Sequence, residues 1–290
     1  MNFAIIGGDM RQLYVCAALE KRGCTVTLFG FEQCENAKSR YRFAAAPEEA
    51  AAGADCVLLP FPAENERKNI NAPFCCTEIY MPDVFSAVKA GTPVLGGKLS
   101  EGMMECAARH KIQLFDYAAR EELIIKNAIP SAEGAIQIAM EELPITLNGS
   151  NCLVTGYGRI GKVLSAMLSA LGARVTVSAR KAADMEWIRF HGCQAVETGA
   201  LSGQIGDFDA VFNTVPSLIF TQELIEQLPE ACLIIDLASM PGGVDFSAAR
   251  RAPRKAIHAL SLPGKVAPAT AGEAVAETVL NLLKETGLEP

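Results

Sequence analysis

Three glycines near the middle of the chain have the spacing of a phosphate-binding turn. They form the pattern Gly-x-Gly-x-x-Gly, directly after the apolar run 152–155 and before a stretch of small and apolar residues. In this context the first glycine permits a tight turn, the second lets the backbone approach a pyrophosphate, and the third allows close helix-to-strand packing. We expect dinucleotide binding here, the alternative being a purely structural turn. The residues concerned are Gly156, Tyr157, Gly158, Arg159, Ile160 and Gly161.

The next strand-like run, 174–178, ends in residues that distinguish the two nicotinamide dinucleotides. A site for NAD usually has an Asp or Glu at this point, which binds the ribose hydroxyls. Here the chain has Ser178, Arg180 and Lys181 instead. A hydroxyl and two cations suit a 2′-phosphate, so the sequence favours NADP, with NAD still possible. The alternative is two solvated cations at the start of a helix.

Two later loops also follow strand-like runs. Asn213, Thr214 and Pro216 come after the run 210–212, and Asp236 and Ser239 come after the run 233–235. In a doubly wound sheet such loops lie along the carboxyl edge, where the nicotinamide end of a bound dinucleotide would extend. We expect the first four of these residues to bind the cofactor and Ser239 to bind substrate, although turn-forming residue types are also common in ordinary loops.

The beginning of the chain has the same turn with different chemistry. After the run 3–6 come Gly7 and Gly8, but Asp9 and Gln12 occupy the places of the second and third glycines. A carboxylate at the second place would repel a pyrophosphate, so no second dinucleotide is expected. Gly8, Arg11 and Gln12 are candidates to bind an anionic substrate group. The alternative makes Asp9 a plain N-cap and Arg11 a solvated cation.

These segments imply a repeated architecture. In both halves sixteen residues separate the first turn glycine from the glycine that ends the following helix. Strand-like and helix-like runs alternate along the rest of the chain, which favours parallel sheets with helices on both faces. We predict two doubly wound α/β domains of the Rossmann type. Further expected strands are 56–59, 92–95, 112–115 and 256–258, and further expected helices are 82–90, 100–110, 182–190 and 221–227.

The expected domains are a substrate domain over 1–125, a connector over 126–150 and a cofactor domain over 151–270. The connector has helical periodicity with an interruption at Pro130, which would make Ser131 an N-cap and place Glu133 in a first turn. The final stretch, 271–290, contains an amphipathic helix with no strand after it. This helix could return to complete the first domain.

Composition limits the function classes. The 290 residues include 26 basic and 33 acidic ones, for a net charge of −7, which disfavours a nucleic-acid-binding surface. No apolar stretch reaches the roughly 18 residues that a membrane span needs. The ten cysteines contain no Cys-x-x-Cys pair and the three histidines are far apart. We therefore expect reduced core thiols, no metal site and a cytoplasmic protein.

Several segments together resemble the A subunit of dipicolinate synthase over nearly the whole chain. The matching segments are 6–12, 127–134, the glycine turn with Arg159, 213–217, 236–243 and 262–272. The two-domain plan is more distantly similar to alanine dehydrogenase and D-2-hydroxyacid dehydrogenases. The resemblance implies NADP-dependent oxidation of 4-hydroxy-tetrahydrodipicolinate, a cyclic imine with two carboxylates, to dipicolinate, with loss of water.

The resemblance also implies partners and a compartment. It implies a second subunit similar to flavodoxin-like flavoproteins, and the mother-cell cytoplasm during sporulation. The expected partners are therefore the small dicarboxylate substrate, this flavoprotein and further copies of the chain. Neither nucleic acid nor a membrane is among them.

The resemblance and the expected chemistry suggest roles for several residues. Glu133 and Asp9 lie in matching segments and are candidates for acid/base or orienting roles, although Glu133 as a helix-capping residue is the open alternative. Arg11 could hold one substrate carboxylate, and Ser131 is a further substrate-binding candidate. His258 is a weaker candidate because it lies in a strand-like run. Two other functions stay open: a different NAD(P)-dependent dehydrogenase of this plan, or a non-catalytic NADPH-binding subunit.

Overall fold

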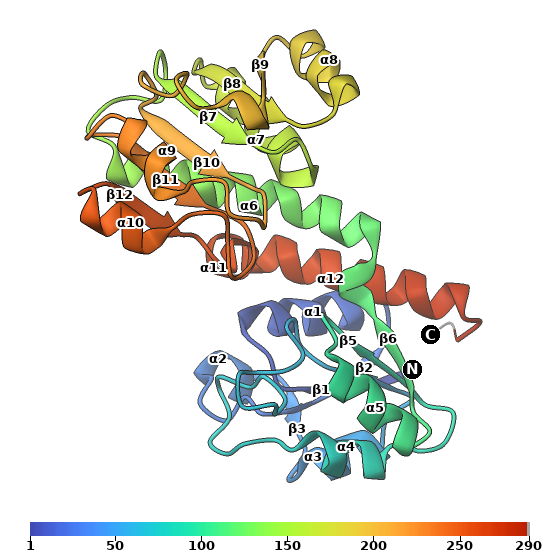
Figure 1. The fold of residues 1–290 in the computed structure, drawn as a ribbon. Helices are drawn as coiled ribbons and strands as arrows, with labels where there is room; N and C mark the ends of the chain where they lie inside the picture. The colour runs from blue at the N-terminus through green and yellow to red at the C-terminus, as the bar shows by residue number, and fades with distance from the viewer. Residues whose placement is uncertain (289–290) are drawn as a thin grey trace. The chain divides into compact units, whose positions relative to one another are not determined.

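Two six-stranded parallel sheets form the framework of the chain. The computed structural model describes residues 1–288 and divides them into unit 1, made of Met1–Lys126 with 267–288, and unit 2, Asn127–Val266. Each sheet carries helices on its faces, as Figure 1 shows with unit 1 in blue to teal plus the red helix and unit 2 in green to orange. The predicted fold class, two doubly wound α/β domains, is confirmed.

The sheet of unit 1 places its first and fourth strands side by side. Its strand order is β3-β2-β1-β4-β5-β6, and every neighbouring pair is parallel. The strands are β1 (Asn2–Ile6), β2 (Thr25–Phe29), β3 (Arg42–Phe43), β4 (Cys56–Leu58), β5 (Pro93–Gly96) and β6 (Gln113–Asp116). Because the chain continues in opposite directions from β1, a crevice at the carboxyl ends of β1 and β4 is the expected ligand site.

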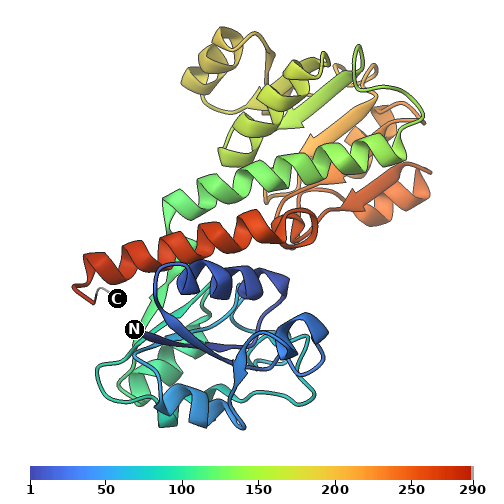
Figure 2. The ribbon, with the colours of Figure 1, turned by 180° about the vertical axis from the view of Figure 1, so that it is seen from behind.

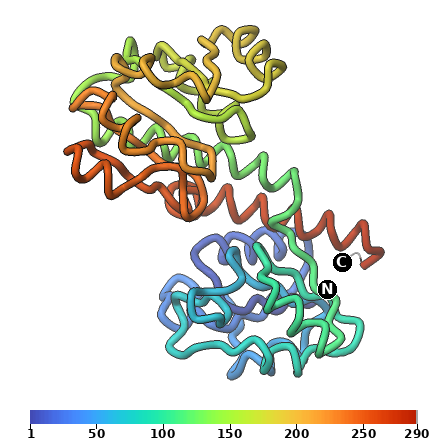
Figure 3. The backbone as a smooth tube through the Cα atoms, in the orientation of Figure 1, coloured from blue at the N-terminus to red at the C-terminus, as the bar shows by residue number. Residues whose placement is uncertain are grey.

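Helices cover both faces of this sheet. They are α1 (Met10–Glu20), α2 (Glu35–Lys38), α3 (Pro47–Ala52), α4 (Met81–Ala87), α5 (Glu101–Arg109), the 3-10 turn η1 (Tyr117–Ala119) and α12 (Pro268–Glu285). Between β4 and α4 the chain runs as a long irregular loop, which the tube in Figure 3 follows. We name residues 59–80 the covering loop, because part of it lies over the Gly7 turn.

The last helix of the chain packs on the first. Figures 1 and 2 show α12 in red against α1 in blue from opposite sides. Val275, Val279 and Leu283 are buried in the same core as Leu19 of α1. A side chain at Gly272 would meet the carbonyl oxygen of Arg11 at 2.5 Å, so the two helices touch backbone to backbone. Residues 289 and 290, the end of the segment expected to complete the first domain, lie outside the described residues.

Unit 2 repeats the topology. Read from β9, its order is β9-β8-β7-β10-β11-β12, again parallel throughout. Its strands are β7 (Asn151–Thr155), β8 (Arg174–Ala179), β9 (Gln194–Glu197), β10 (Ala210–Asn213), β11 (Leu233–Asp236) and β12 (Lys255–His258). Its helices are α7 (Arg159–Ala170), α8 (Ala182–Phe190), η2 (Thr198–Ala200), α9 (Gln222–Gln227), α10 (Phe246–Arg251) and α11 (Leu262–Val266).

One sequence prediction about the connector is wrong. Helix α6 runs without a break over Glu121–Glu142 and contains Pro130, so Ser131 is not an N-cap and Glu133 is not in a first turn. Proline removes one backbone donor from a helix. Pro130 has no N–H to donate to the carbonyl oxygen of Lys126. The Ser131 hydroxyl instead donates to the next carbonyl oxygen, that of Asn127, at 2.7 Å, within the same helix. The later part of α6 belongs to the core of unit 2, through Ala132, Ala139 and other apolar residues.

Candidate functional site

The glycine turn of unit 2 is shaped by two contacts that exclude side chains. Gly156 has φ +92°, and a Cβ there would lie 2.6 Å from the Thr214 hydroxyl oxygen. A Cβ on Gly161 would lie 2.1 Å from the carbonyl oxygen of Gly156. Helix α7 can therefore pack against the end of β7 only because glycine stands at both places.

The middle glycine is different, because it borders open space. Gly158 is the N-cap of α7, has an ordinary φ of −82°, and has nothing within 4 Å of a built Cβ. The backbone at the start of α7 therefore borders open space beside Gly158, and a helix N-terminus next to such space is the arrangement that binds phosphate in dinucleotide folds. Arg159 is the first residue of α7, and Ile160 packs on the core.

This turn lies at the point where the strand order reverses. Strand β7 pairs with β8 on one side and with β10 on the other. The residue after β10 is Thr214, and its hydroxyl donates a hydrogen bond to the carbonyl oxygen of Thr155 at 2.8 Å. The Thr155 hydroxyl donates to Asn213 Oδ1 at 2.6 Å. The glycine turn and the 214–217 loop are thus fixed together at the crevice where doubly wound sheets bind ligands.

Asn213 and Asp236 hold the loops of this edge from inside. Both are fully buried at the ends of adjacent strands, and Asn213 Nδ2 donates to Asp236 Oδ1 at 2.7 Å. Asp236 also accepts from the backbone N–H groups of Ala238 at 3.0 Å and Gly243 at 2.8 Å. Neither side chain reaches the surface, so their geometry suits positioning of the loops 214–217 and 238–243 better than direct cofactor contact. Pro216 and Ser239, on those loops, are exposed.

The basic residues at the end of β8 are exposed, and the hydroxyl is not. Arg180 and Lys181 both face solvent at the start of α8. Ser178 is fully buried, and its hydroxyl oxygen accepts from the Thr198 hydroxyl at 3.2 Å. Of the three residues predicted to meet a 2′-phosphate, the two cations are accessible and Ser178 is turned into the protein.

Tyr157, within the glycine turn, packs against the core of unit 2. Its ring is half-buried with the Lys162 ammonium 5.4 Å from the ring centroid, and its hydroxyl oxygen is 3.3 Å from His191 Nδ1. Burial is the main cause that raises the pKa of the Tyr157 phenol, so the ring is neutral at physiological pH. His258 is occupied elsewhere: its Nε2 lies 2.8 Å from the carbonyl oxygen of Ala238, to which it must donate.

The corresponding turn of unit 1 is closed. The Gly8 N–H donates to the carbonyl oxygen of Asn71 in the covering loop at 2.8 Å, so it is already satisfied. Gln12, at the place of the third glycine, is buried beside Gly8 and donates to the carbonyl oxygen of Leu59 at 3.3 Å. The space that stays open beside Gly158 is filled by this chain's own residues in unit 1.

Asp9 and Arg11 form a pair at the start of α1. Asp9 is the N-cap and accepts from the Arg11 backbone at 3.0 Å, while its carboxylate is held by Arg11 Nε at 2.9 Å and Nη2 at 2.7 Å. The Arg11 guanidinium also donates to the carbonyl oxygen of Phe61 and lies over the Phe61 ring, 5.4 Å from its centroid. The Arg11 guanidinium is therefore buried and paired with a carboxylate, and it is not the solvated cation of the alternative interpretation.

The remaining substrate candidates lie on α6. Ser131 is buried and its hydroxyl is bonded within the helix, whereas Glu133 is exposed. Because both belong to unit 2 and Asp9 belongs to unit 1, the structure of each unit by itself does not bring these predicted residues together.

The sequence is similar to that of a known protein over its whole length. Residues 2–118 match the family model of the N-terminal domain of the dipicolinate synthase A subunit. The dipicolinate synthase A subunit of Bacillus subtilis (strain 168) is 32% identical over 290 residues, covering 100% of this chain and 98% of the relative. The chain belongs to the dipicolinate synthase A-subunit family.

Solved structures agree with this family membership. The dipicolinate synthase A subunit from Bacillus halodurans superimposes with a TM-score of 0.89 at 31% identity, covering 97% of each chain. An L-alanine dehydrogenase has a TM-score of 0.68 at 13% identity, covering 99% of this chain and 91% of the other, which shows a shared fold. The family resemblance drawn from the sequence is confirmed.

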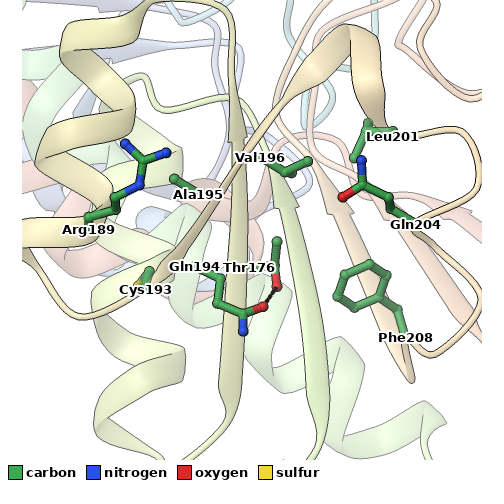
Figure 4. A pocket seen from close by; sticks show the side chains of 9 residues that line it. All are labelled: Thr176, Arg189, Cys193, Gln194, Ala195, Val196, Leu201, Gln204 and Phe208. Carbon is green, nitrogen blue, oxygen red and sulfur yellow. Dashed lines mark hydrogen bonds between the residues drawn. The ribbon is translucent and has the colours of Figure 1, made fainter.

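A pocket elsewhere in unit 2 of this family member is separate from the glycine turn. This cavity of about 450 Å³ lies between β8, β9 and the loop 201–208. Figure 4 shows the side chains that line it, among them Phe208 and Thr176, whose hydroxyl donates a hydrogen bond to the Gln194 side chain. None of its lining residues belongs to the glycine turn or to the loops after β10 and β11. It lies where β9 connects to β10 through η2 and a loop without an α-helix.

Potential metal ligands and thiols are dispersed through the family member's described residues. Within residues 1–288 no three His, Cys, Asp or Glu side chains are grouped as a metal would require, and no helix there could cross a membrane. All ten cysteines are free thiols, and eight of them are buried. Burial raises the pKa of Cys232 to about 12, so this thiol is protonated and unreactive at neutral pH.

Sequence reasoning missed one feature at the carboxyl edge of unit 1. Lys98 follows β5 with φ +59°, a backbone conformation that side chains other than glycine adopt rarely. The signal was present as a Gly-Gly-Lys run directly after an expected strand. The acceptor that fixes this conformation, Asp116, is eighteen residues away in sequence and only the fold brings it near.

Proposed function

We propose that the protein oxidises 4-hydroxy-tetrahydrodipicolinate to dipicolinate with NADP⁺ as the hydride acceptor. In the whole reaction the substrate loses one water, a hydride and a proton, which gives the aromatic pyridine dicarboxylate, NADPH and H⁺. Membership of the A-subunit family supports the substrate class. The observation that carries the proposal is the open glycine turn of unit 2 with two exposed cations at the end of β8.

The residues of unit 2 fit the cofactor. The N–H groups at the start of α7 would meet the pyrophosphate beside Gly158, where no side chain intrudes. Arg180 and Lys181 would bind the 2′-phosphate, because a guanidinium and an ammonium suit a phosphate better than ribose hydroxyls. Thr214, Pro216 and neighbouring backbone would line the nicotinamide end, with Asn213 and Asp236 keeping their loops in place.

Unit 1 would bind the dicarboxylate. Its glycine turn is filled, which favours a small ligand over a second dinucleotide. We keep Asp9 as the orienting or proton-accepting group, with Arg11 as its partner, and Glu133 as the second candidate for proton transfer. Gly8, Gln12, Ser131 and Ser239 remain predicted substrate-side residues, which a structure with bound ligand would test.

The proposal includes a partner and a compartment. We infer that this chain assembles with a second subunit, a flavodoxin-like flavoprotein, and that the complex works in the mother-cell cytoplasm during sporulation. Self-association of the chain is also proposed. These statements rest on family membership.

The test is a direct assay with enzymatically prepared 4-hydroxy-tetrahydrodipicolinate. The purified chain should produce NADPH, seen by its absorbance, together with dipicolinate. Its KM for NADP⁺ should be lower than its KM for NAD⁺. Cofactor binding with turnover only after the second subunit is added would favour a non-catalytic NADPH-binding subunit. Turnover of alanine or a 2-hydroxyacid in place of this substrate would favour another dehydrogenase.

A further inference from the structure

Lys98 is held in an unfavourable conformation at the carboxyl edge of unit 1. Its φ of +59° costs energy for a residue with a side chain. The Asp116 carboxylate compensates by accepting three backbone N–H groups, from Lys98 at 3.0 Å, Leu99 at 3.1 Å and Ala118 at 2.8 Å. We name these three hydrogen bonds the Asp116 clamp. Because β5 and β6 are paired, the Asp116 clamp fixes where the Lys98 side chain leaves the sheet edge.

The clamp belongs to the same edge as the Asp9–Arg11 pair. A Cβ on the buried Gly97 would lie 2.7 Å from Phe61 Cβ and 2.8 Å from the Tyr117 ring. The backbone just before Lys98 is therefore in close contact with both aromatic residues. The Gly97 N–H donates to the carbonyl oxygen of Pro60 at 3.0 Å. Phe61, on the other side, receives the Arg11 guanidinium. One short segment of the covering loop therefore connects Lys98 to the expected anion-binding turn.

The charges at this edge single out Lys98. Four other basic side chains lie on or beside the carboxyl-edge loops of unit 1, and each has a carboxylate partner. The pairs are Arg11–Asp9, Arg67–Glu78, Lys68–Glu64 and Arg120 with Glu122 and Glu285. Lys98 is exposed, and no carboxylate among residues 1–288 pairs with its ammonium.

We propose that Lys98 binds one carboxylate of the substrate, an inference that rests on the proposed dicarboxylate function. A cation without a carboxylate partner binds a substrate carboxylate more strongly than a neutral donor does, and the buried Arg11 is already held by Asp9. The Asp116 clamp positions the lysine backbone before substrate arrives, which lowers the entropy lost on binding. Lys98 is thus a binding residue, and no proton transfer is assigned to it.

The chain supplies a matched control for this proposal. Lys111 is also an exposed lysine with positive φ, +56°, but it lies in the turn that precedes β6, at the opposite edge of the sheet. Substituting glycine at either position removes one cation and relieves one strained backbone. K98G and K111G should therefore both fold, with melting temperatures equal to or above that of the wild type.

Only K98G should affect the substrate. We expect its KM for 4-hydroxy-tetrahydrodipicolinate to rise about 10- to 100-fold, the usual loss for a charged contact, with the NADP dissociation constant unchanged. K111G should keep the wild-type KM, and K98R should recover part of the loss. An unchanged KM in K98G, while the wild type turns over, rejects the role of Lys98 and leaves the proposed function standing.

A second arm changes the ligand. Wild-type protein should bind pyridine-2,6-dicarboxylate more tightly than pyridine-2-carboxylate by calorimetry, and K98G should lose most of that difference. If K98G discriminates between the two acids as well as the wild type does, Lys98 does not bind the second carboxylate. If the wild type binds neither acid and shows no turnover even with the second subunit, both the inference and the proposed function are rejected.

Discussion

Two exposed cations at the end of β8 should decide which nicotinamide dinucleotide binds. Replacing Arg180 with Asp puts a carboxylate where a 2′-phosphate would lie, so repulsion replaces a charge-assisted hydrogen bond. We expect the NADP dissociation constant to rise about 10- to 100-fold, with a smaller or opposite change for NAD. Fluorescence titration with both cofactors measures this.

Arg250→Asp is a suitable control for that substitution, because Arg250 is an exposed arginine on α10 of the same unit. It changes the net charge by the same amount and should leave both dissociation constants near their wild-type values. Equal effects of the two variants would mean that general charge, and not a contact at the end of β8, governs NADP binding.

The two glycines of the turn should separate fold from cofactor binding. Gly161→Ala places a methyl group against the Gly156 carbonyl oxygen, and the backbone must shift at a cost of roughly 1–3 kcal/mol. Gly158→Ala meets open space at an ordinary φ, so unfolding by urea should be near wild type while NADP binding is lost. If Gly158→Ala bound NADP normally, the pyrophosphate would not approach at this place.

At the scale of elements, the buried Asn213–Asp236 pair joins two strand ends to two loops. Asp236→Ala leaves the Ala238 and Gly243 N–H groups and the Asn213 amide without their acceptor. We expect about 2–4 kcal/mol of lost stability and weaker NADP binding, because the loops beside the crevice lose their anchor. Thermal unfolding and cofactor titration measure the two effects.

Asp245→Ala provides the comparison, since Asp245 caps α10 through one hydrogen bond to the Ala248 N–H. Loss of an N-cap costs about 1 kcal/mol, and NADP binding should not change. Similar behaviour of the two variants would argue that Asp236 is an ordinary cap and not an organiser of the edge.

The regular elements were predictable because local sequence determines them. Continuous apolar runs followed by glycine turns predicted both βαβ units. The predicted ends of strands such as β1 and β7 agree with the structure to within a few residues. The two-residue β3 and the short helix α3 were not predicted, because so few residues carry little periodicity. Pro130 suggested a break in α6, but packing in the core of unit 2 keeps the helix intact.

The site was predictable in its glycines and less so in its polar residues. Glycine spacing reflects backbone geometry. The sequence therefore predicted both the positions of Gly156 and Gly161 and the reason that each must be glycine, a tight turn and close helix-to-strand packing. Sequence says where a strand ends but not which side of the sheet edge a side chain faces. Ser178 therefore looked available to a phosphate although its hydroxyl is buried, and the pairing of Arg11 with Asp9 depends on a rotamer that no pattern reveals.

For the whole molecule, burial should make most thiols unreactive. Cys76 is exposed and Cys75 is half-buried, while the other eight cysteines are buried. Burial raises the pKa of Cys75 and of Cys232, so the reactive thiolate is scarce at neutral pH. Ellman's reagent should modify one thiol quickly and a second slowly in native protein, and all ten after unfolding without reductant. Fewer than ten would reveal a disulfide.

The packing of α12 on α1 makes unit 1 depend on both ends of the chain. A ribosome releases the N-terminal residues long before it synthesises Val275, Val279 and Leu283, which cover the apolar face of α1. Unit 2, contiguous in sequence, can acquire its whole core first. The nascent polypeptide therefore exposes the uncovered apolar face of α1 until α12 has been synthesised, and a transiently exposed apolar surface of this kind is prone to aggregation.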